Sequence, residues 1–255
     1  MSKIEKISSI VIAKNEEKNI VRCIESQLNC IDEIIVLVDK MSTDKTFEVA
    51  SSYDKVVCKI VDWKGFAETK KEALALTTFN WVFWIDADEE ITDKLNDELI
   101  AIKETETKYN AFKVARRAFF LGKWIKHSGW YPDYVTRLFN KIYGSFDESK
   151  VHEGLIIDGD IGTLKYDLNH YTDPTIKHYF DKFNNYTSLA AEDMKSKGRI
   201  ATIFDILLRP PFKFFKMYIF QLGFLDGIHG FILAVFSSAY VFTKYCKLWE
   251  LNKED

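Results

Sequence analysis

Several carboxylates and one amide follow apolar segments near the start of the chain, at positions where buried strands are expected to end. They are Asn15 and Glu16 after Ile7–Ala13, Asp39 at the end of Glu33–Asp39, and Asp86 and Asp88 after Trp81–Ile85. Carboxylates repel phosphate groups, but they can hold them through a divalent cation, and oxygen ligands suit Mg²⁺ or Mn²⁺. Asp39 could instead accept a hydrogen bond from the imide of a nucleobase. This chemistry is typical of a site for a nucleoside diphosphate.

Several other kinds of site are disfavoured. No G-x-G-x-x-G follows the first apolar segment, which argues against a dinucleotide cofactor, and the chain has no G-x-x-x-x-G-K-[ST] for a P-loop. The four cysteines form no C-x-x-C pair and predict reduced thiols in a cytoplasmic protein. With 35 Lys and Arg against 38 Asp and Glu, the net charge of −3 argues against nucleic acid as a partner.

The elements that must position these side chains alternate between strand and helix patterns. The apolar segments predict buried parallel strands, and amphipathic segments between them, such as Phe66–Thr77, predict helices. We therefore expect an α/β fold whose mostly parallel, Rossmann-like central sheet carries helices on both faces. In such sheets ligands bind at the carboxyl ends of the strands. Strand-like pieces beyond residue 110 predict an extension of the sheet.

The composition changes after a helical segment that ends at Gly198. Residues 199–255 are rich in Phe, and Pro210-Pro211 is expected to divide them into separate helices. The uncharged stretch Gly227–Thr243 has 17 residues, whereas a spanning helix needs ~20. We therefore predict a catalytic domain over residues 1–198 and a C-terminal helical segment over residues 199–255.

Basic residues flank the aromatic clusters of this segment, namely Arg209, Lys213, Lys216, Lys244 and Lys247. Aromatic rings flanked by cations are typical of helices that lie in a membrane interface. The membrane interpretation places the protein peripherally on the inner face of the cytoplasmic membrane. Two other arrangements stay open: the helices could pack against the catalytic domain, or they could form a homodimer.

Three motifs occur in order at the expected strand ends, and together they resemble family 2 glycosyltransferases. They are Ala13-Lys14-Asn15-Glu16-Glu17, Val38-Asp39 with Ser42-Thr43-Asp44-Lys45-Thr46, and the DXD triplet Asp86-Ala87-Asp88. Further segments are similar to the branch that adds glucose to the lipopolysaccharide inner core, namely Gly65–Leu74, Gly129–Asp133, Arg137–Phe139, Val151–Glu153 and Gly223–Gly227. The similarity covers nearly the whole chain.

The resemblance implies a GT-A fold, a nucleotide-sugar donor, a divalent metal (Mn²⁺ or Mg²⁺) and inversion at the anomeric carbon. The implied donor contacts are Ala13, Asn15 and Glu16 at the nucleoside, Asp39 at the base, Asp86 on the ribose side and Asp88 at the metal, with Asp86 a further metal ligand. The pair Lys40-Met41 stands where the family usually has small residues, which bears on the shape of the base pocket.

An inverting transfer needs a base that removes the proton of the acceptor hydroxyl. Glu153 is the first candidate, because the pair His152-Glu153 matches the family. His152 is the rival, because its ordinary pKa lies closer to neutrality. A third interpretation makes Glu153 a structural carboxylate on a loop. His170 could complete the metal shell, or it could be a hydrogen-bonded core histidine.

The remaining candidates each have a structural alternative. Lys70 could face the diphosphate, or it could be a solvated charge on a helix. Arg137 could be a phosphate partner in the donor site or a salt-bridged strand residue. Trp130 and Tyr131, with Asp133, are candidates for the acceptor side, where the rings could stack on a sugar face or belong to an aromatic core.

We therefore predict an inverting, metal-dependent glycosyltransferase that moves a hexose, by resemblance glucose, from a UDP-sugar to a hydroxyl of a glycolipid or a lipopolysaccharide or lipooligosaccharide core. One alternative is a sugar nucleotidyltransferase, which would need a Gly-rich basic loop where Asn15-Glu16-Glu17 stands. The other is a catalytically inactive membrane-bound scaffold, against which the intact Asp86-Ala87-Asp88 and Glu153 argue.

Overall fold

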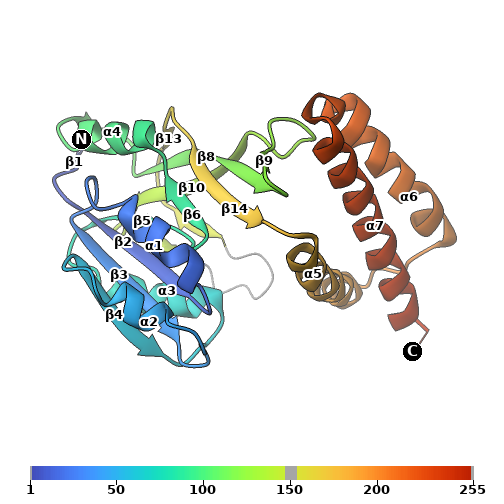
Figure 1. The fold of residues 1–255 in the computed structure, drawn as a ribbon, viewed down its shortest axis with the longest axis horizontal. Helices are drawn as coiled ribbons and strands as arrows, with labels where there is room; N and C mark the ends of the chain where they lie inside the picture. The colour runs from blue at the N-terminus through green and yellow to red at the C-terminus, as the bar shows by residue number, and fades with distance from the viewer. Residues whose placement is uncertain (1, 147–153, 254–255) are drawn as a thin grey trace. The chain divides into compact units, whose positions relative to one another are not determined.

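The computed structural model describes residues 2–146 and 154–253, which form two compact units (Figure 1). The first unit holds Met1–Arg116 and Asp133–His170, and the second holds Arg117–Pro132 and Tyr171–Asp255. The boundary predicted after Gly198 therefore differs from the division that the structure makes. The reason is that the helix before Gly198 packs against the last helix of the chain, so both belong to one unit.

Half of the main sheet is parallel, as the sequence predicts. Strands β4 (Val56–Val61), β3 (Glu33–Asp39), β2 (Ile7–Ala13) and β5 (Trp81–Trp84) lie side by side in this order. The strands β2 and β3 are almost completely buried, because helices cover both faces. The edge strand β4 alternates between partly buried and exposed residues.

The predicted extension of the sheet is confirmed and is antiparallel at its start. Strand β10 pairs antiparallel with β5 and with β8, and β14 and β6 follow at that edge. Their bounds, with the two short strands that pair with β8, are β10 (Asp133–Asn140), β8 (Ala111–Phe120), β14 (Leu168–Asp173), β6 (Glu89–Ile91), β13 (Ile161–Thr163) and β9 (Lys123–Trp124). Two further pairs are β1 (Ser2–Lys3) with β7 (Glu106–Thr107) and β11 (Gly144–Phe146) with β12 (Leu155–Ile157).

Helices cover both faces of the parallel half, which confirms the α/β prediction. The helices are α1 (Glu17–Glu25), α2 (Thr46–Ala50), α3 (Phe66–Ala75) and α4 (Asp93–Ile102). Ile24 of α1 and Leu99 of α4 pack in one core with Val11 of β2. The neighbouring Ile10 points to the opposite face and packs in a second core with Ala73 of α3. Because the strand alternates its side chains, one apolar run supplies both cores.

The second unit is mainly helical. It contains α5 (Ile176–Ser196), α6 (Ile203–Phe215), a π-helical turn η1 (Lys216–Phe220), a 3-10 turn η2 (Gly223–Asp226) and α7 (Ile228–Leu251). Helix α7 packs against both α5 and α6. At its start Gly230 approaches Gly223 so closely that a β-carbon on Gly230 would lie 1.9 Å from the Gly223 carbonyl oxygen. A residue without a β-carbon is therefore required there.

The pair Pro210-Pro211 does not divide the segment as predicted, because α6 continues through both prolines. The Ser238 hydroxyl of α7 donates a 2.8 Å hydrogen bond to the Pro210 carbonyl oxygen. The prolines still remove two backbone donors from α6, and the packing of α6 against α7 stabilises the continuous helix. In the described ranges, α7 is the one helix whose length of 24 residues and apolar composition would suffice to cross a membrane.

Candidate active site

The predicted donor-site residues of the first unit meet at one edge of its sheet. The adjacent strands β3, β2 and β5 are parallel, so their carboxyl ends lie together. Asp39 ends β3, Ala13 ends β2 beside Val38, and Asp86 and Asp88 follow β5. This is the edge at which open parallel sheets bind ligands.

The loops after β2 and β3 are joined by hydrogen bonds. The Asn15 side-chain oxygen accepts from the Thr43 amide at 2.8 Å, and the Glu16 amide donates to the Thr46 hydroxyl at 2.8 Å. Asn15 has a φ of 56°, in the left-handed region that Asn tolerates better than most residues. These contacts give Asn15 a role in shaping the loop, and its predicted contact with a nucleoside stays a prediction.

Asp39 is a buried, ionised carboxylate at this edge. The Lys14 amine lies 2.8 Å from its Oδ2, and the Met41 amide donates to its Oδ1 at 2.9 Å. These hydrogen bonds, from Lys14 first, hold the pKa of Asp39 below its ordinary value. A fixed charged acceptor of this kind suits the imide N–H of a nucleobase.

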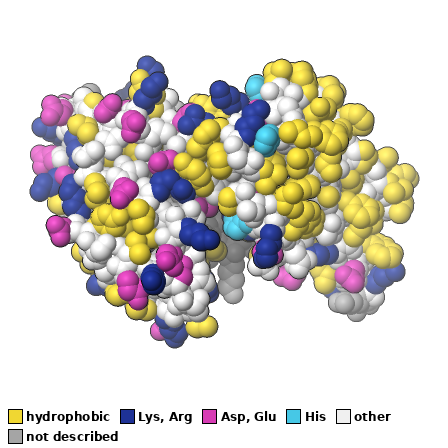
Figure 2. Space-filling view, in the orientation of Figure 1, with side chains coloured by type: hydrophobic (Ala, Val, Ile, Leu, Met, Phe, Trp, Pro, Cys, Tyr) yellow, Lys and Arg dark blue, Asp and Glu magenta, His cyan; other side chains and the backbone are white. Residues whose placement is uncertain are grey.

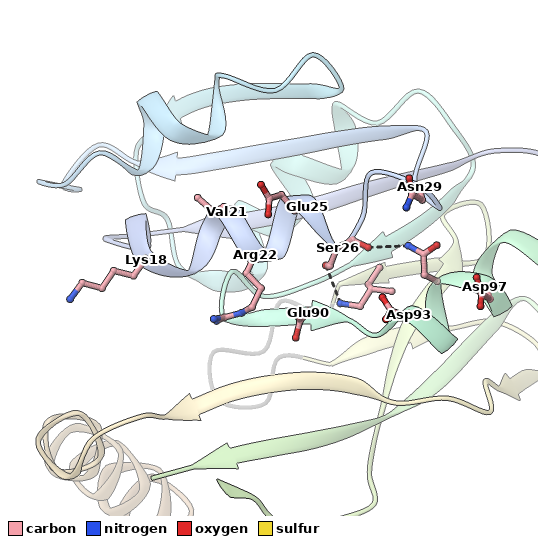
Figure 3. A pocket seen from close by; sticks show the side chains of 11 residues that line it. Lys18, Val21, Arg22, Glu25, Ser26, Asn29, Glu90, Asp93 and Asp97 are labelled. Atoms are coloured by element: carbon pink, nitrogen blue, oxygen red, sulfur yellow. Dashed lines mark hydrogen bonds between the residues drawn. The ribbon is translucent and has the colours of Figure 1, made fainter. Parts of the chain in front are cut away.

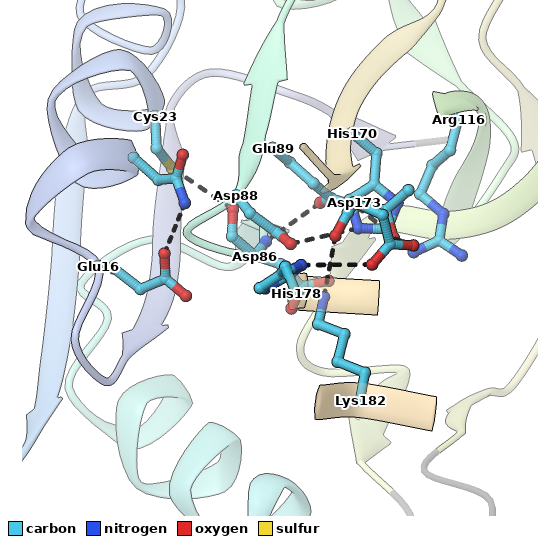
Figure 4. A network of polar contacts seen from close by, with 12 residues as sticks. Glu16, Cys23, Asp86, Asp88, Glu89, Arg116, His170, Asp173, His178 and Lys182 are labelled. Atoms are coloured by element: carbon cyan, nitrogen blue, oxygen red, sulfur yellow. Dashed lines mark hydrogen bonds and ion pairs between the residues drawn. The ribbon is translucent and has the colours of Figure 1, made fainter. Parts of the chain in front are cut away.

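Asp86, whose side chain is 34% exposed, forms a charge cluster with two buried residues, Glu89 and Arg137. The side chains of Asp86, Asp88 and Glu89 lie close together in Figure 4. Arg137, on β10, is fully buried, and its Nη2 lies 2.7 Å from Asp86 Oδ2 and also contacts Glu89. The Asp86 amide donates to the other Glu89 oxygen at 3.1 Å. Burial opposes ionisation of Asp86, but Arg137 and Lys70 outweigh it and hold the pKa of Asp86 well below its ordinary value. Burial raises the pKa of Glu89, and the neighbouring Arg137 opposes that rise.

Lys70 and Arg137 both lie against the indole ring of Trp84. The Arg137 guanidinium carbon is 3.5 Å from the ring centroid and the Lys70 amine is 4.1 Å from it. Lys70 is only 7% exposed, so the interpretation of this residue as a solvated helical charge is wrong. The structure shows the alternative in which Arg137 is a salt-bridged strand residue, because its Nη2 contacts both Asp86 and Glu89, whereas its buried Nε and Nη1 have no hydrogen-bond partner among the described residues.

Asp88 faces His170 of β14. Asp88 Oδ2 lies 3.5 Å from His170 Nε2, and both side chains are 20% exposed. Over residues 2–146 and 154–253, no group of three or more His, Cys, Asp and Glu side chains is arranged to hold a metal ion. A cation here would therefore take one oxygen and one nitrogen from these two residues and its other ligands from the diphosphate and water. Mn²⁺ accepts this mixed donor set.

The predicted acceptor-side residues are distributed over both units. Asp133 accepts from Arg116 Nε at 2.9 Å, and Arg116 also reaches Glu89 at 3.5 Å. Trp130, in the second unit, lies 5.9 Å from the Phe120 ring in an edge-on contact, which fits the aromatic-core alternative. Tyr131 precedes a cis proline in the same unit. The two candidate bases, His152 and Glu153, lie outside the described residues.

Three residues of this region were not assigned from the sequence: Trp84, Glu89 and Arg116. Glu89 is one of several acidic residues after β5, and nothing in its spacing separates it from Glu90. A signal was nevertheless available, since a buried arginine requires carboxylate partners. Had Arg137 been assigned to the sheet interior, the acids after β5 would have been the first candidates for its partners.

A pocket elsewhere on the first unit contains none of the predicted site residues (Figure 3). Helix α1 contributes Lys18 and Arg22 to its lining, and α4 contributes Asp93 and Asp97. Its wall is held by ordinary structural contacts, such as the 3.0 Å bond from the Ile91 amide to the Ser26 hydroxyl. We assign it no part in the chemistry of the strand-end site.

The motif Gly223–Gly227 is structural in the second unit. Asp226 is buried and accepts hydrogen bonds from the amides of Lys126 at 3.3 Å and His127 at 2.9 Å. Its carbonyl oxygen accepts from the Lys123 amine at 2.8 Å. The carboxylate thus fixes the loop that leads to Trp130 and Tyr131.

Known proteins resemble this chain over almost its full length. It is 30% identical over 255 residues to the lipopolysaccharide core biosynthesis glycosyltransferase LpsC of Rhizobium meliloti (strain 1021), covering 96% of this chain and 92% of LpsC. It is 31% identical over 260 residues to an uncharacterized glycosyltransferase of Rickettsia typhi (strain ATCC VR-144 / Wilmington), covering 97% of this chain and 88% of the relative.

The fold is that of a GT-A glycosyltransferase. The mannosyltransferase PcManGT from Pyrobaculum calidifontis, solved with GDP-Man and Mn²⁺, aligns with a TM-score of 0.56 and 13% identity over 96% of this chain and 87% of that one. The sequence model of glycosyl transferase family 2 matches residues 8–154, more than half of the chain. The chain therefore belongs to glycosyl transferase family 2.

Proposed function

We propose that this enzyme transfers a hexose, expected to be glucose, from a UDP-sugar to a hydroxyl of a lipopolysaccharide or lipooligosaccharide core glycolipid, with inversion at the anomeric carbon. The observation that carries the proposal is the gathering of Asp39, Asp86 and Asp88 at one edge of the parallel sheet. The full-length similarity to LpsC supports a lipopolysaccharide core as acceptor. The choice of glucose and of UDP rests on the sequence resemblance.

In this proposal the donor lies across the carboxyl ends of β2, β3 and β5. Asp39 accepts the hydrogen bond of the base, while Ala13, whose small side chain ends β2, leaves room for the nucleoside. Asp86 serves the ribose side with its carboxylate orientation fixed by Arg137. Lys70 faces the same charge cluster and lowers the pKa of Asp86, so it supplies positive charge near the diphosphate.

The residues present fit a divalent cation, with Asp88 and His170 as its protein ligands. A bound divalent cation would supply charge stabilisation to the leaving diphosphate. The imidazole nitrogen favours Mn²⁺ over Mg²⁺, because Mg²⁺ prefers an all-oxygen shell. We propose that Glu153 removes the proton of the acceptor hydroxyl, with His152 as the alternative base.

The donor is tested by thermal-shift measurements with UDP-hexoses and GDP-hexoses in the presence of Mn²⁺. A donor at 100 times its Kd stabilises the folded protein by ~2.7 kcal/mol, which is easily measured. Transfer is then assayed with that donor and lipopolysaccharide whose core lacks its hexose. Binding of GDP-sugars but not UDP-sugars would overturn the donor assignment, and donor hydrolysis without transfer would overturn the acceptor.

Glu153→Gln is expected to lower kcat by about 10²–10⁴-fold while the donor Kd changes little, because the amide keeps the shape but cannot accept the proton. Steady-state kinetics together with donor titration of the same variant measure the two effects. His152→Gln is the matched comparison. An active Glu153→Gln beside an inactive His152→Gln would assign the base to His152.

We propose further that the second unit attaches the enzyme peripherally to the membrane that holds its acceptor. Hydrophobic side chains gather over α6 and α7 (Figure 2). Along α6 the side chains of Phe204, Leu208 and Phe212 repeat every four residues and are 69%, 60% and 64% exposed. An exposed apolar stripe of this size is unusual unless it meets a partner or a membrane. The similarity to LpsC, a core biosynthesis enzyme, favours the membrane over a homodimer.

Replacing Phe204, Leu208 and Phe212 by Ser is expected to abolish flotation with liposomes while the thermal unfolding temperature stays close to that of the unchanged protein. The three exposed side chains bury little area within the chain, so their loss removes membrane contact and not core packing. Sedimentation at several protein concentrations is the second measurement. If the variant still floats, or if the unchanged chain is a dimer that the variant splits, the stripe is not the membrane contact.

A further inference from the structure

A cluster of cations comes from α6, α7 and the residues just before α6, near the exposed stripe of α6. Arg199, Arg209 and Lys244 surround the ring of Tyr245, with their charged groups 5.7, 5.2 and 5.3 Å from its centroid. Lys213 is close enough to repel Lys244 electrostatically. We call these four cations the α6–α7 basic cluster: Arg199, Arg209, Lys213 and Lys244.

The cluster has too little negative charge of its own. Asp205 pairs with Arg209 and lies 3.9 Å from Arg199, but it is also used by the amide and hydroxyl of Thr202 at 3.0 and 2.8 Å. Within the described part of the chain, no carboxylate lies within ion-pair distance of Lys213 or Lys244. Four cations thus share one carboxylate, which leaves a concentrated positive site.

Two of the cations, Lys213 and Lys244, are half-buried, which makes their excess positive charge costly. Burial lowers the pKa of Lys244, and repulsion from Arg199, Arg209 and Lys213 lowers it further. Burial lowers the pKa of Lys213 as well, with a contribution from Lys216. An anion placed among these groups would relieve both repulsion and desolvation.

Two members of the cluster, Arg209 and Lys213, lie on α6, the helix that carries the stripe, and Lys244 lies on α7. Arg209 and Lys213 are four residues apart, and each directly follows a stripe residue, Leu208 and Phe212. A ligand that contacts both the basic cluster and the stripe must carry a negatively charged group next to an apolar chain. A free phosphate would leave the stripe in water, and an acidic peptide would not match its Phe and Leu side chains.

We propose that the α6–α7 basic cluster is a binding site for the phosphodiester headgroup of an anionic phospholipid, whose acyl chains lie along the stripe Phe204, Leu208 and Phe212. The inference rests on the proposed membrane attachment and adds a specific headgroup site to it. The Arg guanidinium groups supply planar forks for the phosphate oxygens, and the Lys amines supply point charges. The structure thereby assigns a lipid preference to the second unit.

The test compares Lys213→Gln/Lys244→Gln with a charge-matched control, Lys59→Gln/Lys108→Gln, whose lysines lie in the first unit. Neither member of the first pair has an ion pair to lose among the described residues, so folding is expected to survive. Binding is measured with vesicles of phosphatidylcholine alone and of phosphatidylcholine with phosphatidylglycerol. Each cation near an anionic surface contributes about 1 kcal/mol, so the cluster variant should bind anionic vesicles about 30-fold more weakly.

The expected result is that this loss is confined to anionic vesicles and that the control variant keeps most of its binding. An equal loss of binding to anionic vesicles in both variants would overturn the site, because it would show attraction by the overall positive charge of the surface and no specific headgroup site. Stabilisation by inorganic phosphate without a preference for anionic vesicles would also overturn it, in favour of free phosphate. Failure of the unchanged protein to bind either vesicle would instead overturn the membrane attachment, and unaltered donor binding in all variants separates both results from the catalytic proposal.

Discussion

Asp88→Ala is expected to abolish sugar transfer while the free energy of unfolding changes little. Asp88 lies just after β5, is 20% exposed, and contacts His170 at 3.5 Å outside the charge cluster of Asp86, Glu89 and Arg137. Removing it takes away one of the two protein ligands that we propose for the divalent cation. The remaining imidazole cannot by itself replace the charge of the lost carboxylate.

The measurement pairs a transfer assay with calorimetric titration of Mn²⁺ in the presence of UDP, so that metal affinity is observed apart from turnover. Asp97→Ala is a suitable control, because Asp97 is an exposed carboxylate on α4 and lines only the pocket of α1 and α4. Asp97→Ala should leave the rate of sugar transfer and the affinity for Mn²⁺ unchanged. Full transfer in EDTA, or an active Asp88→Ala enzyme, would contradict the metal assignment.

The strand ends of the donor site could be predicted because they depend on local pattern. Continuous apolar runs mark β2 and β3 to the residue, and the parallel arrangement then brings Asp39 and Asp86 to one edge of the sheet. The α/β class follows from the same alternation. To predict these features, it is enough to know the hydrophobic pattern of the sequence and the rule that the carboxyl ends of parallel strands lie at one edge of the sheet.

The environment of the cations at this edge could not be predicted in the same way. The sequence of α3, which carries Lys70, is amphipathic and gives no sign that this lysine is buried. Its burial depends on Trp84, which comes from a different element, β5. Arg137 meets Asp86 across 51 residues of sequence, through the antiparallel pairing of β10 with β5. Side-chain burial of this kind is set by tertiary packing and leaves no periodic signal.

The packing of the helices on either side of Gly198 could not be predicted for a related reason. The change in composition is real, but α5 and α7 form one packed unit, and the Lys247 amine of α7 holds it to α5 through the Asn184 carbonyl oxygen and the Thr187 and Ser188 hydroxyls. The prolines of α6 were expected to end a helix, yet packing on α7 keeps it continuous. Contacts between distant helices overrode local propensity in both cases.

Arg137→Met is expected to lower the free energy of unfolding by about 3–5 kcal/mol, because removing one member of a buried ion pair leaves its partners uncompensated. Arg137 is fully buried, and its Nη2 serves both Asp86 and Glu89. Arg116 contacts Glu89 at 3.5 Å but is already engaged by Asp133, so it cannot neutralise both acids. Denaturant unfolding monitored by circular dichroism measures the change.

A second substitution distinguishes loss of charge balance from loss of packing. Met fills the space beside Trp84, so the double variant Arg137→Met/Glu89→Gln differs from the single one mainly by removing one buried negative charge. Its free energy of unfolding should lie between those of the single variant and the unchanged protein. If the defect came from packing alone, the second substitution would give no recovery.

A third variant, Arg137→Lys, together with Arg137→Met, decides between the two roles considered for Arg137. A residue that positions Asp86 should, when replaced by Lys, keep part of the stability because the charge remains, while the donor Kd rises as the Asp86 carboxylate loses its fixed orientation. A direct phosphate partner would behave differently: Arg137→Met would fold with unchanged stability and lose only donor affinity. Because the guanidinium is buried between two carboxylates, we expect stability and donor affinity to fall together, with the fall in stability the larger effect.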